Sequence, residues 1–218
     1  MKHGKARKGN GLTAAGLLLI AAALFLTACN LWEGRRAGNH AEEAARQIVR
    51  QIPMSRSAAP EPEKPGLESS VPADLPDPER ELPTVETEGN EYIGILDIPA
   101  LALSLPVMEE WSEEKLKLAP CRYLGSAYRD DLIIAAHNYR RHFGSLHRLR
   151  PGDEVLFTDT EGTVFSYTVV QIETLDGGAV EEMSRGDWAL TLFTCTLGGK
   201  SRVTVRCERT GNGGGETE

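Results

Sequence analysis

Three side chains in the C-terminal half of the chain could together perform acyl transfer. Cys195 ends a strongly apolar run, Trp188 to Thr194, and the polar, glycine-containing stretch after it favours an accessible thiol. His137 ends another apolar run, Leu132 to Ala136, where an acid or base could reach a substrate. Arg202 follows shortly after Cys195, and a guanidinium near sulfur favours the thiolate and can stabilise an oxyanion.

Each of these residues also has a purely structural interpretation. Free cysteines are among the most buried residue types, so Cys195 taken alone is equally a core residue. A single histidine or arginine at a strand end is usually a solvated side chain. The three together, each at one end of a predicted β-strand, favour the catalytic interpretation. Cys195 is then the nucleophile, His137 the acid or base, and Arg202 the oxyanion ligand.

Neighbouring polar residues supply weaker candidates. Thr194 and Asn138, each adjacent in sequence to a candidate catalytic residue, are predicted to hydrogen-bond the substrate backbone. The alternative for Thr194 is an ordinary β-favouring residue. His142 and His147 lie in a stretch with the composition of a short helical turn, and both are predicted to be surface side chains.

Composition narrows the function classes. With 24 Lys and Arg against 32 Asp and Glu, the net charge is −8, which argues against a nucleic-acid partner. The four cysteines form no CxxC pair, so we expect no metal site. Cys207 alternates with Val203 and Val205 and is expected to be a free thiol inside the domain. A disulfide between Cys121 and Cys207 is the alternative.

The N-terminal segment indicates export or membrane anchoring. Residues 1–8 are basic, and residues 11–29 carry no charge over roughly the length of a membrane-spanning helix. Because basic residues before an apolar helix stay in the cytoplasm, the remainder is predicted to be extracytoplasmic at the cell membrane. Residues 26–29 also form a lipobox-like Leu-Thr-Ala-Cys, in which Cys29 would be lipidated. Residues 1–29 are therefore a signal anchor or a lipoprotein signal peptide.

The rest of the chain divides into a linker, one domain and a tail. Residues 30–90 are expected to hold a short helix at 39–50 and then a disordered Pro/Glu-rich tether. Residues 91–210 contain short β-branched and aromatic runs separated by Gly, Pro and Asp, typical of an all-β barrel or sandwich. The expected strands are 92–99, 101–108, 131–137, 154–159, 163–175, 188–195 and 201–209. A hairpin is expected at 159–162 and a helix, capped by Ser112, at 111–118. Residues 211–218 are expected to be disordered.

At this point the sequence resembles the sortase family over roughly Tyr92 to Arg209. Thr191-Leu-Phe-Thr-Cys195 matches the family's TLxTC motif, preceded by His137 after an apolar strand and followed by Arg202 at the start of a Val-rich strand. Residues 92–99 resemble the family's first barrel strand, and residues 137–153 resemble class B members. The loop from Cys195 to Arg202 is shorter than in many sortases. The resemblance therefore does not indicate which peptide signal the protein would recognise.

The resemblance implies an eight-stranded sortase β-barrel with short helices, and a cysteine transpeptidase that needs no cofactor. Its substrates would be secreted proteins with a C-terminal LPxTG-like sorting signal. Cys195 would form a thioacyl enzyme, and an amine of a cell-wall precursor or a pilin would accept the acyl group. The alternatives are a secreted cysteine peptidase that uses water, and a non-catalytic β-barrel lipoprotein that binds a ligand.

Overall fold

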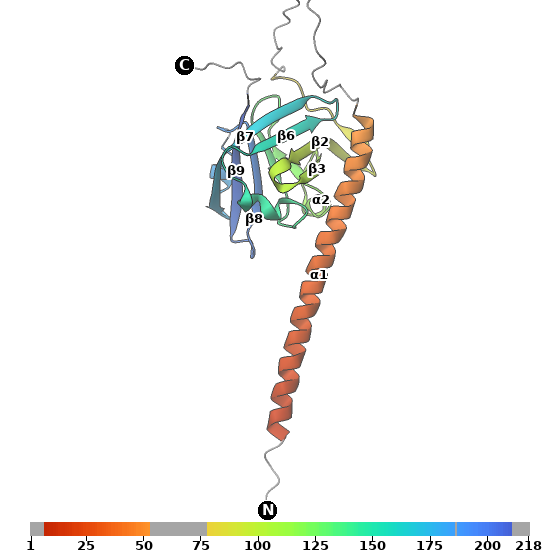
Figure 1. The fold of residues 1–218 in the computed structure, drawn as a ribbon, viewed down its shortest axis with the longest axis vertical. Helices are drawn as coiled ribbons and strands as arrows, with labels where there is room; N and C mark the ends of the chain where they lie inside the picture. Colours follow the sequence, from red (N-terminus) through yellow and green to blue (C-terminus); the bar gives the residue numbers. More distant parts are fainter. Residues whose placement is uncertain (1–6, 53–77, 186, 211–218) are drawn as a thin grey trace, which may run out of the picture.

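The computed structural model describes residues 7–52, 78–185 and 187–210, which form one long helix and a β-barrel (Figure 1). The helix α1 spans Arg7–Gln51. The strands are β1 (Val85–Thr87), β2 (Asn90–Ile98), β3 (Leu103–Met108), β4 (Cys121–Leu124), β5 (Leu132–Ala135), β6 (Glu154–Asp159), β7 (Val164–Asp176), β8 (Leu190–Cys195) and β9 (Ser201–Arg209). Short helices lie between them, namely η1 (Pro99–Leu101), α2 (Glu113–Leu116), η2 (Phe143–Arg148) and α3 (Val180–Met183).

Eight of these strands close into a barrel. The hydrogen-bonded order is β2-β3-β4-β5-β8-β9-β7-β6, and β6 pairs again with β2. The pairs β3–β4 and β5–β8 are parallel, and the remaining pairs are antiparallel. Closure leaves the strands that carry the candidate residues no free edge, so their ends are fixed relative to one another.

A glycine permits this closure at β2. Strand β2 changes partner along its length, pairing first with β1 and then, from Gly94, with β6. A Cβ atom at Gly94 would lie 2.1 Å from the Thr158 carbonyl oxygen, and its φ of +153° is a conformation that favours glycine. Only glycine therefore lets β6 approach β2 this closely.

Alternating side chains of the strands fill the barrel. Strand β6 shows the period of two directly, with Val155 and Phe157 buried and Glu154 exposed. The largest fully buried side chains of the barrel include Tyr167, Phe157, Phe165, Ile93, Leu96 and Ile134. Burying a side chain of this size contributes about 1.5–3 kcal/mol, so the interior is the main source of stability.

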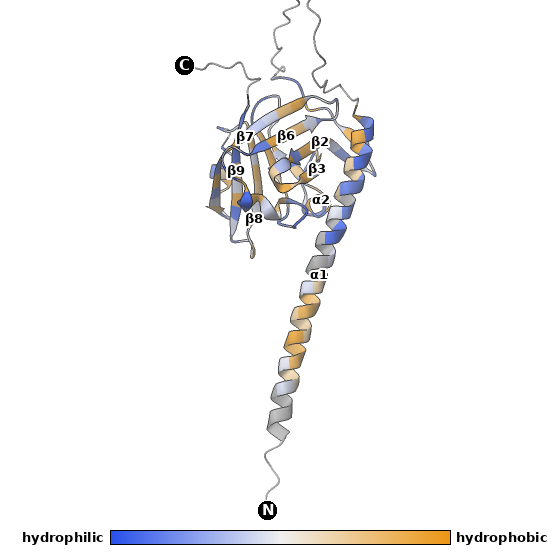
Figure 2. Cartoon of the chain, viewed as in Figure 1, coloured by the Kyte–Doolittle hydropathy of each residue, from blue (hydrophilic) through white to orange (hydrophobic). Residues whose placement is uncertain are grey.

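The C-terminal part of α1 is built into the domain. Ala41, Ala44 and Ile48 are buried, and the last two pack with Tyr92 and Met108 on the outside of the barrel. Small alanines let the helix backbone approach the strands closely. The N-terminal part of α1 runs away from the barrel (Figure 1), and Figure 2 shows that this part is apolar. Its exposed large side chains are Leu17, Leu18, Leu19, Ile20, Leu24, Phe25 and Leu26.

Among the helices of residues 7–52, 78–185 and 187–210, none is both long and apolar enough to cross a membrane.

Most expected elements are present, and two strands are additional. The strands expected at 154–159 and 201–209 coincide with β6 and β9, and Ser112 caps α2 by accepting a hydrogen bond from the Lys115 amide (3.1 Å). The sequence analysis missed β4, and β1 lies inside the expected tether. The helix expected at 39–50 is the end of a continuous 45-residue helix. Residues 53–77 of the tether and the tail 211–218 lie outside the described residues.

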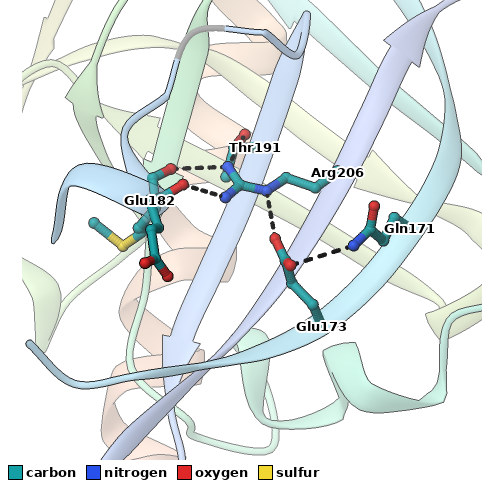
Figure 3. A network of polar contacts seen from close by, with 6 residues as sticks. Gln171, Glu173, Glu182, Thr191 and Arg206 are labelled. Atoms are coloured by element: carbon teal, nitrogen blue, oxygen red, sulfur yellow. Dashed lines mark hydrogen bonds and ion pairs between the residues drawn. The ribbon is translucent and has the colours of Figure 1, made fainter. Parts of the chain in front are cut away.

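A buried arginine holds the short helix α3 on the outside of the barrel (Figure 3). Arg206 of β9 is 3% exposed and donates to the main-chain oxygens of Met183 (2.8 Å) and Glu182 (2.6 Å). It also donates to Glu173 of β7 (2.9 Å) and Thr191 of β8 (3.1 Å). The guanidinium therefore joins α3 to three neighbouring strands.

Replacing this guanidinium should loosen α3. We expect Arg206→Lys to lower the free energy of unfolding by about 1.5–3 kcal/mol, because an ammonium cannot make the same forked set of hydrogen bonds. Thermal unfolding followed by circular dichroism measures the loss. Arg140→Lys, at an exposed position, is the matched control. Equal melting temperatures for the two variants would contradict the role given to Arg206.

Candidate active site

Cys195 and Arg202 face each other across two paired strands. Strands β8 and β9 are antiparallel, and Cys195 is the direct Cα partner of Arg202. Side chains of directly opposed residues lie on the same face of a sheet, with Cβ atoms about 4.5–5.5 Å apart. Both side chains are half-buried. The pairing thus places the side chain of Arg202 next to that of Cys195, whose thiol is accessible.

His137 lies level with this pair on the other side of β8. Strands β5 and β8 are parallel, with Ala135 opposite Phe193, and the Ala136 amide donates to the Phe193 carbonyl oxygen (3.2 Å). His137 and Cys195 each lie two residues further along. Neighbouring strands are about 4.8 Å apart, so the register brings the imidazole, the thiol and the guanidinium to one end of three adjacent strands.

The face that carries these residues is lined by apolar side chains. Ile133, Ala135, Phe193 and Met183 form one buried cluster, with Leu116, Tyr123 and Leu175 packed against it. Rings of Trp111, Tyr123 and Phe193 follow one another across the face at centroid distances of 5.7 Å and 5.3 Å. Trp111 is 47% exposed, so this row of rings leads from the surface toward Cys195. An extended peptide with apolar residues would find contacts along it.

The loop after Cys195 is a tight hairpin turn. The Thr196 amide donates to the Ser201 carbonyl oxygen (2.8 Å), and their hydroxyls are 2.9 Å apart. Gly198 and Gly199 have φ angles of +89° and +72°, which only glycine adopts readily. Leu197 at the tip is 93% exposed. This turn is what returns the chain so that Arg202 meets Cys195.

The structure distinguishes between the two arginines of β9 nearest the thiol. Arg206 is buried in the contacts with α3 and β7 already described. Arg202 is half-buried, and one N–H donates to the carbonyl oxygen of Gly177, in the turn before α3. A guanidinium has several N–H donors, so this contact leaves donors for a substrate oxygen. Of these two arginines, Arg202 is the one that lies directly opposite Cys195.

Burial sets the protonation of His137. It lowers the pKa of the imidazole below its ordinary value of 6.5, since the cation loses hydration. Glu113 of α2 opposes this shift and Lys117, just after α2, adds to it. The ring of Tyr139 lies 5.0 Å from that of His137, centroid to centroid. The neutral imidazole is therefore favoured before substrate binds.

The two weaker candidates differ in placement. Thr194 is 3% exposed and pairs with Val203, so by alternation its side chain lies on the opposite face from Cys195. The period of two therefore turns this side chain toward the barrel interior, and its hydrogen bond to a substrate backbone stays a prediction. Asn138 is half-buried directly after His137, and its role stays a prediction.

The other cysteines are separated from this site. Cys121 and Cys207 are fully buried free thiols, and burial raises the pKa of each to about 12. They are unreactive on both counts. Cys29 is a partly exposed free thiol in α1. Among the residues that the structure describes, no group of three or more His, Cys, Asp and Glu side chains could hold a metal ion.

One histidine differs from expectation. His147 is exposed as expected, but His142 is completely buried, and its ring lies 5.5 Å from that of Tyr139. The segment after β5 folds back on itself before η2, which carries His142 inward. Composition alone could not show this, because the reversal depends on main-chain contacts with His137 and Tyr139.

Comparison with known proteins supports one family. Solved structures similar to this chain include sortase A from Corynebacterium diphtheriae (20% identity, 58% of this chain and 64% of that chain, TM-score 0.50). Others are sortase C1 from Streptococcus suis (25%, 56% and 75%, 0.48) and sortase C from Clostridium perfringens SM101 (24%, 55% and 70%, 0.47). The first of these supports the fold. Comparison with curated proteins finds no match.

The sortase domain model matches residues 96–210. This range contains the strands that carry His137, Cys195 and Arg202, and it covers more than half of the chain. The barrel closure, the register of β5, β8 and β9, and this match agree. The chain belongs to the sortase family.

Proposed function

We propose that this sortase is a transpeptidase that cleaves an LPxTG-like sorting signal of secreted proteins and transfers the product to an amine. The observation that carries the proposal is the register that sets Cys195 opposite Arg202 and level with His137 at the end of an apolar face. The family match supports the reaction class. The identity of the signal is inferred from the resemblance to the family.

The reaction has two steps. His137, neutral at rest, takes the proton of the Cys195 thiol. The thiolate attacks the carbonyl carbon of the threonine-like residue of the signal, and Arg202 donates hydrogen bonds to the resulting oxyanion. The C–N bond then breaks, His137 in its protonated form gives its proton to the leaving amine, and a thioester remains on Cys195. An acceptor amine attacks this thioester, loses its proton to His137, and displaces the thiolate.

The apolar face beside Cys195 is the proposed binding surface for the signal peptide. The row formed by Trp111, Tyr123 and Phe193 ends beside Cys195, so apolar residues of the signal that precede the cleaved bond can lie against it. An amine of a cell-wall precursor or of a pilin is the proposed acceptor, whereas water as acceptor would make the protein a peptidase.

The non-catalytic alternative has less support. A binding module with only structural cysteines would bury Cys195 as it buries Cys121 and Cys207. Instead, Cys195 is half-buried at a strand end opposite an arginine. That arrangement favours a thiol that reacts.

The N-terminal helix is the proposed attachment to the cell membrane, with the barrel outside the cytoplasm. Seven large apolar side chains between Leu17 and Leu26 are exposed on the part of α1 that leaves the barrel. Exposed apolar side chains gathered on one helical segment call for a partner such as lipid. Attachment occurs either through the uncleaved helix or through an acylated Cys29.

Substitutions of the three candidate residues should separate their roles in cleavage of a sorting-signal peptide. We expect Cys195→Ala to abolish turnover and His137→Ala to reduce it by about 10²–10⁴-fold, as for loss of a general acid. Arg202→Lys should remain severely impaired, because an ammonium keeps the charge but not the fork of donors. Kinetics with a fluorogenic peptide measure all three variants. Normal turnover by Cys195→Ala would contradict the proposal.

The mode of attachment can be tested by intact mass spectrometry of the protein extracted from membranes. Acylation of Cys29 predicts a chain that begins at Cys29 and carries the mass of attached acyl groups. A signal anchor predicts a chain that retains residues 1–28. Recovery of the whole protein in the soluble fraction would contradict membrane attachment in either form.

A further inference from the structure

The segment that follows His137 is a compact loop. The Phe143 amide donates back to the His137 carbonyl oxygen (3.2 Å), and the amides of His142 and Gly144 both donate to the carbonyl oxygen of Tyr139 (2.9 and 3.0 Å). The rings of His137, Tyr139 and His142 follow one another at 5.0 and 5.5 Å. Residues 139–142 are therefore joined to His137 through both its main chain and its ring.

One side chain of this loop reaches α1. The guanidinium of Arg141 forms an ion pair with Glu42 and donates a hydrogen bond to the Asn39 side-chain oxygen (2.9 Å). Gly38 makes room for the contact, because a Cβ atom there would lie 2.3 Å from Cδ of Arg141. Within about one turn of α1, two residues thus bind the Arg141 side chain and a third leaves space for it.

Other packing between this loop and α1 is incomplete. A cavity of about 470 Å³ lies beside the contact, lined by residues of α1, residues of η1 and β3, and both Arg140 and Arg141. The α1 helix itself is fixed to the barrel by Ala41, Ala44 and Ile48. The helix is therefore already held in place. Arg141 joins the loop to it at a position where apolar side chains do not.

We propose that Arg141 is a positioning residue, which ties the loop carrying His137 to α1 and so holds the imidazole level with Cys195. The inference rests on the proposed function, because it assigns His137 the role of proton donor. It also makes α1 part of the active-site support in addition to its proposed membrane attachment.

Two acceptors on α1 are needed because either alone would hold Arg141 weakly. The side chains of Arg141 and Glu42 are 38% and 52% exposed, and ion pairs of this kind contribute little in isolation. The hydrogen bond to Asn39 and the absence of a side chain at Gly38 define one position for the guanidinium. Reversing the charge of Arg141 would turn attraction to Glu42 into repulsion and move the loop.

Exchanging the charges of Arg141 and Glu42 in the full-length protein tests the positioning role of Arg141. We expect Arg141→Glu to reduce kcat for the sorting-signal peptide by about tenfold with KM unchanged, as for a misplaced catalytic group. The double variant Arg141→Glu/Glu42→Arg should recover most of this loss, because the attraction is restored with its direction reversed. Arg140→Glu makes the same charge change at the adjacent exposed residue and should stay close to wild type.

The titration of His137, followed by NMR in a Cys195→Ala background, gives a readout that does not need activity. Loss of the contact between Arg141 and α1 should hydrate the His137 ring and raise its pKa toward the ordinary value of 6.5. The charges of Glu113 and Lys117, which also act on this pKa, are unchanged in the variant. Melting temperatures report any general unfolding, and Glu42→Gln is a milder variant should Arg141→Glu fold poorly.

The outcomes separate the two hypotheses. A wild-type protein without activity on any sorting-signal peptide would refute the proposed function, while a raised His137 midpoint in Arg141→Glu would still support the positioning role. Equal kcat and equal His137 midpoints in Arg141→Glu and Arg140→Glu would overturn the inference. So would a double variant no better than Arg141→Glu.

Discussion

The arrangement of the candidate site depends on the pairing of β8 with β9. That pairing sets Cys195 opposite Arg202, and the parallel pairing of β8 with β5 adds His137 at the same level. Hydrogen-bond ladders fix such registers, since a slip of one residue would turn each side chain to the other face. The barrel closes around these strands, and the remaining elements are arranged over a site whose geometry the ladders have already set.

The walls of the site rely on polar contacts from outside the strands. Arg206 holds α3 by its main-chain oxygens, and α3 contributes Met183 to the apolar face beside the thiol. Arg202 reaches Gly177 in the turn before α3. On the other side, Arg141 links the loop after His137 to α1. Three arginines thus hold segments that lie outside the strands against the rest of the domain.

Sequence periodicity was sufficient where a strand is long and alternates clearly, as in β6 and β9. It missed β4, whose four residues include half-buried Arg122 and Tyr123 and show no alternation. It also could not show that α1 continues without a break until it packs on the barrel. Ala44 and Ile48 are buried only because Tyr92 and Met108 lie beside them, and Ala41 only because it meets the main core. Local composition says little about contacts between distant segments.

The candidate site, too, could be predicted only in part from the sequence. Cys195 and His137 were each marked by an apolar run and a change to polar residues, and Arg202 by its place at the start of a Val-rich run. The sequence could therefore place all three at strand ends. The burial of Thr194 and His142 could not be predicted, because side-chain direction depends on register and on the reversal of the loop after β5. The role of Arg141 had no signal in the sequence, since its partners lie about a hundred residues away on α1.

A thioester on Cys195 is the intermediate on which the account depends. Brief reaction with a sorting-signal peptide, acid quenching and peptide mapping by mass spectrometry would detect it. The account predicts an adduct on Cys195 with the mass of the signal up to its threonine, which a following addition of amine converts to ligated peptide. Peptide cleavage with no adduct, or an adduct on Cys121 or Cys207, would contradict it.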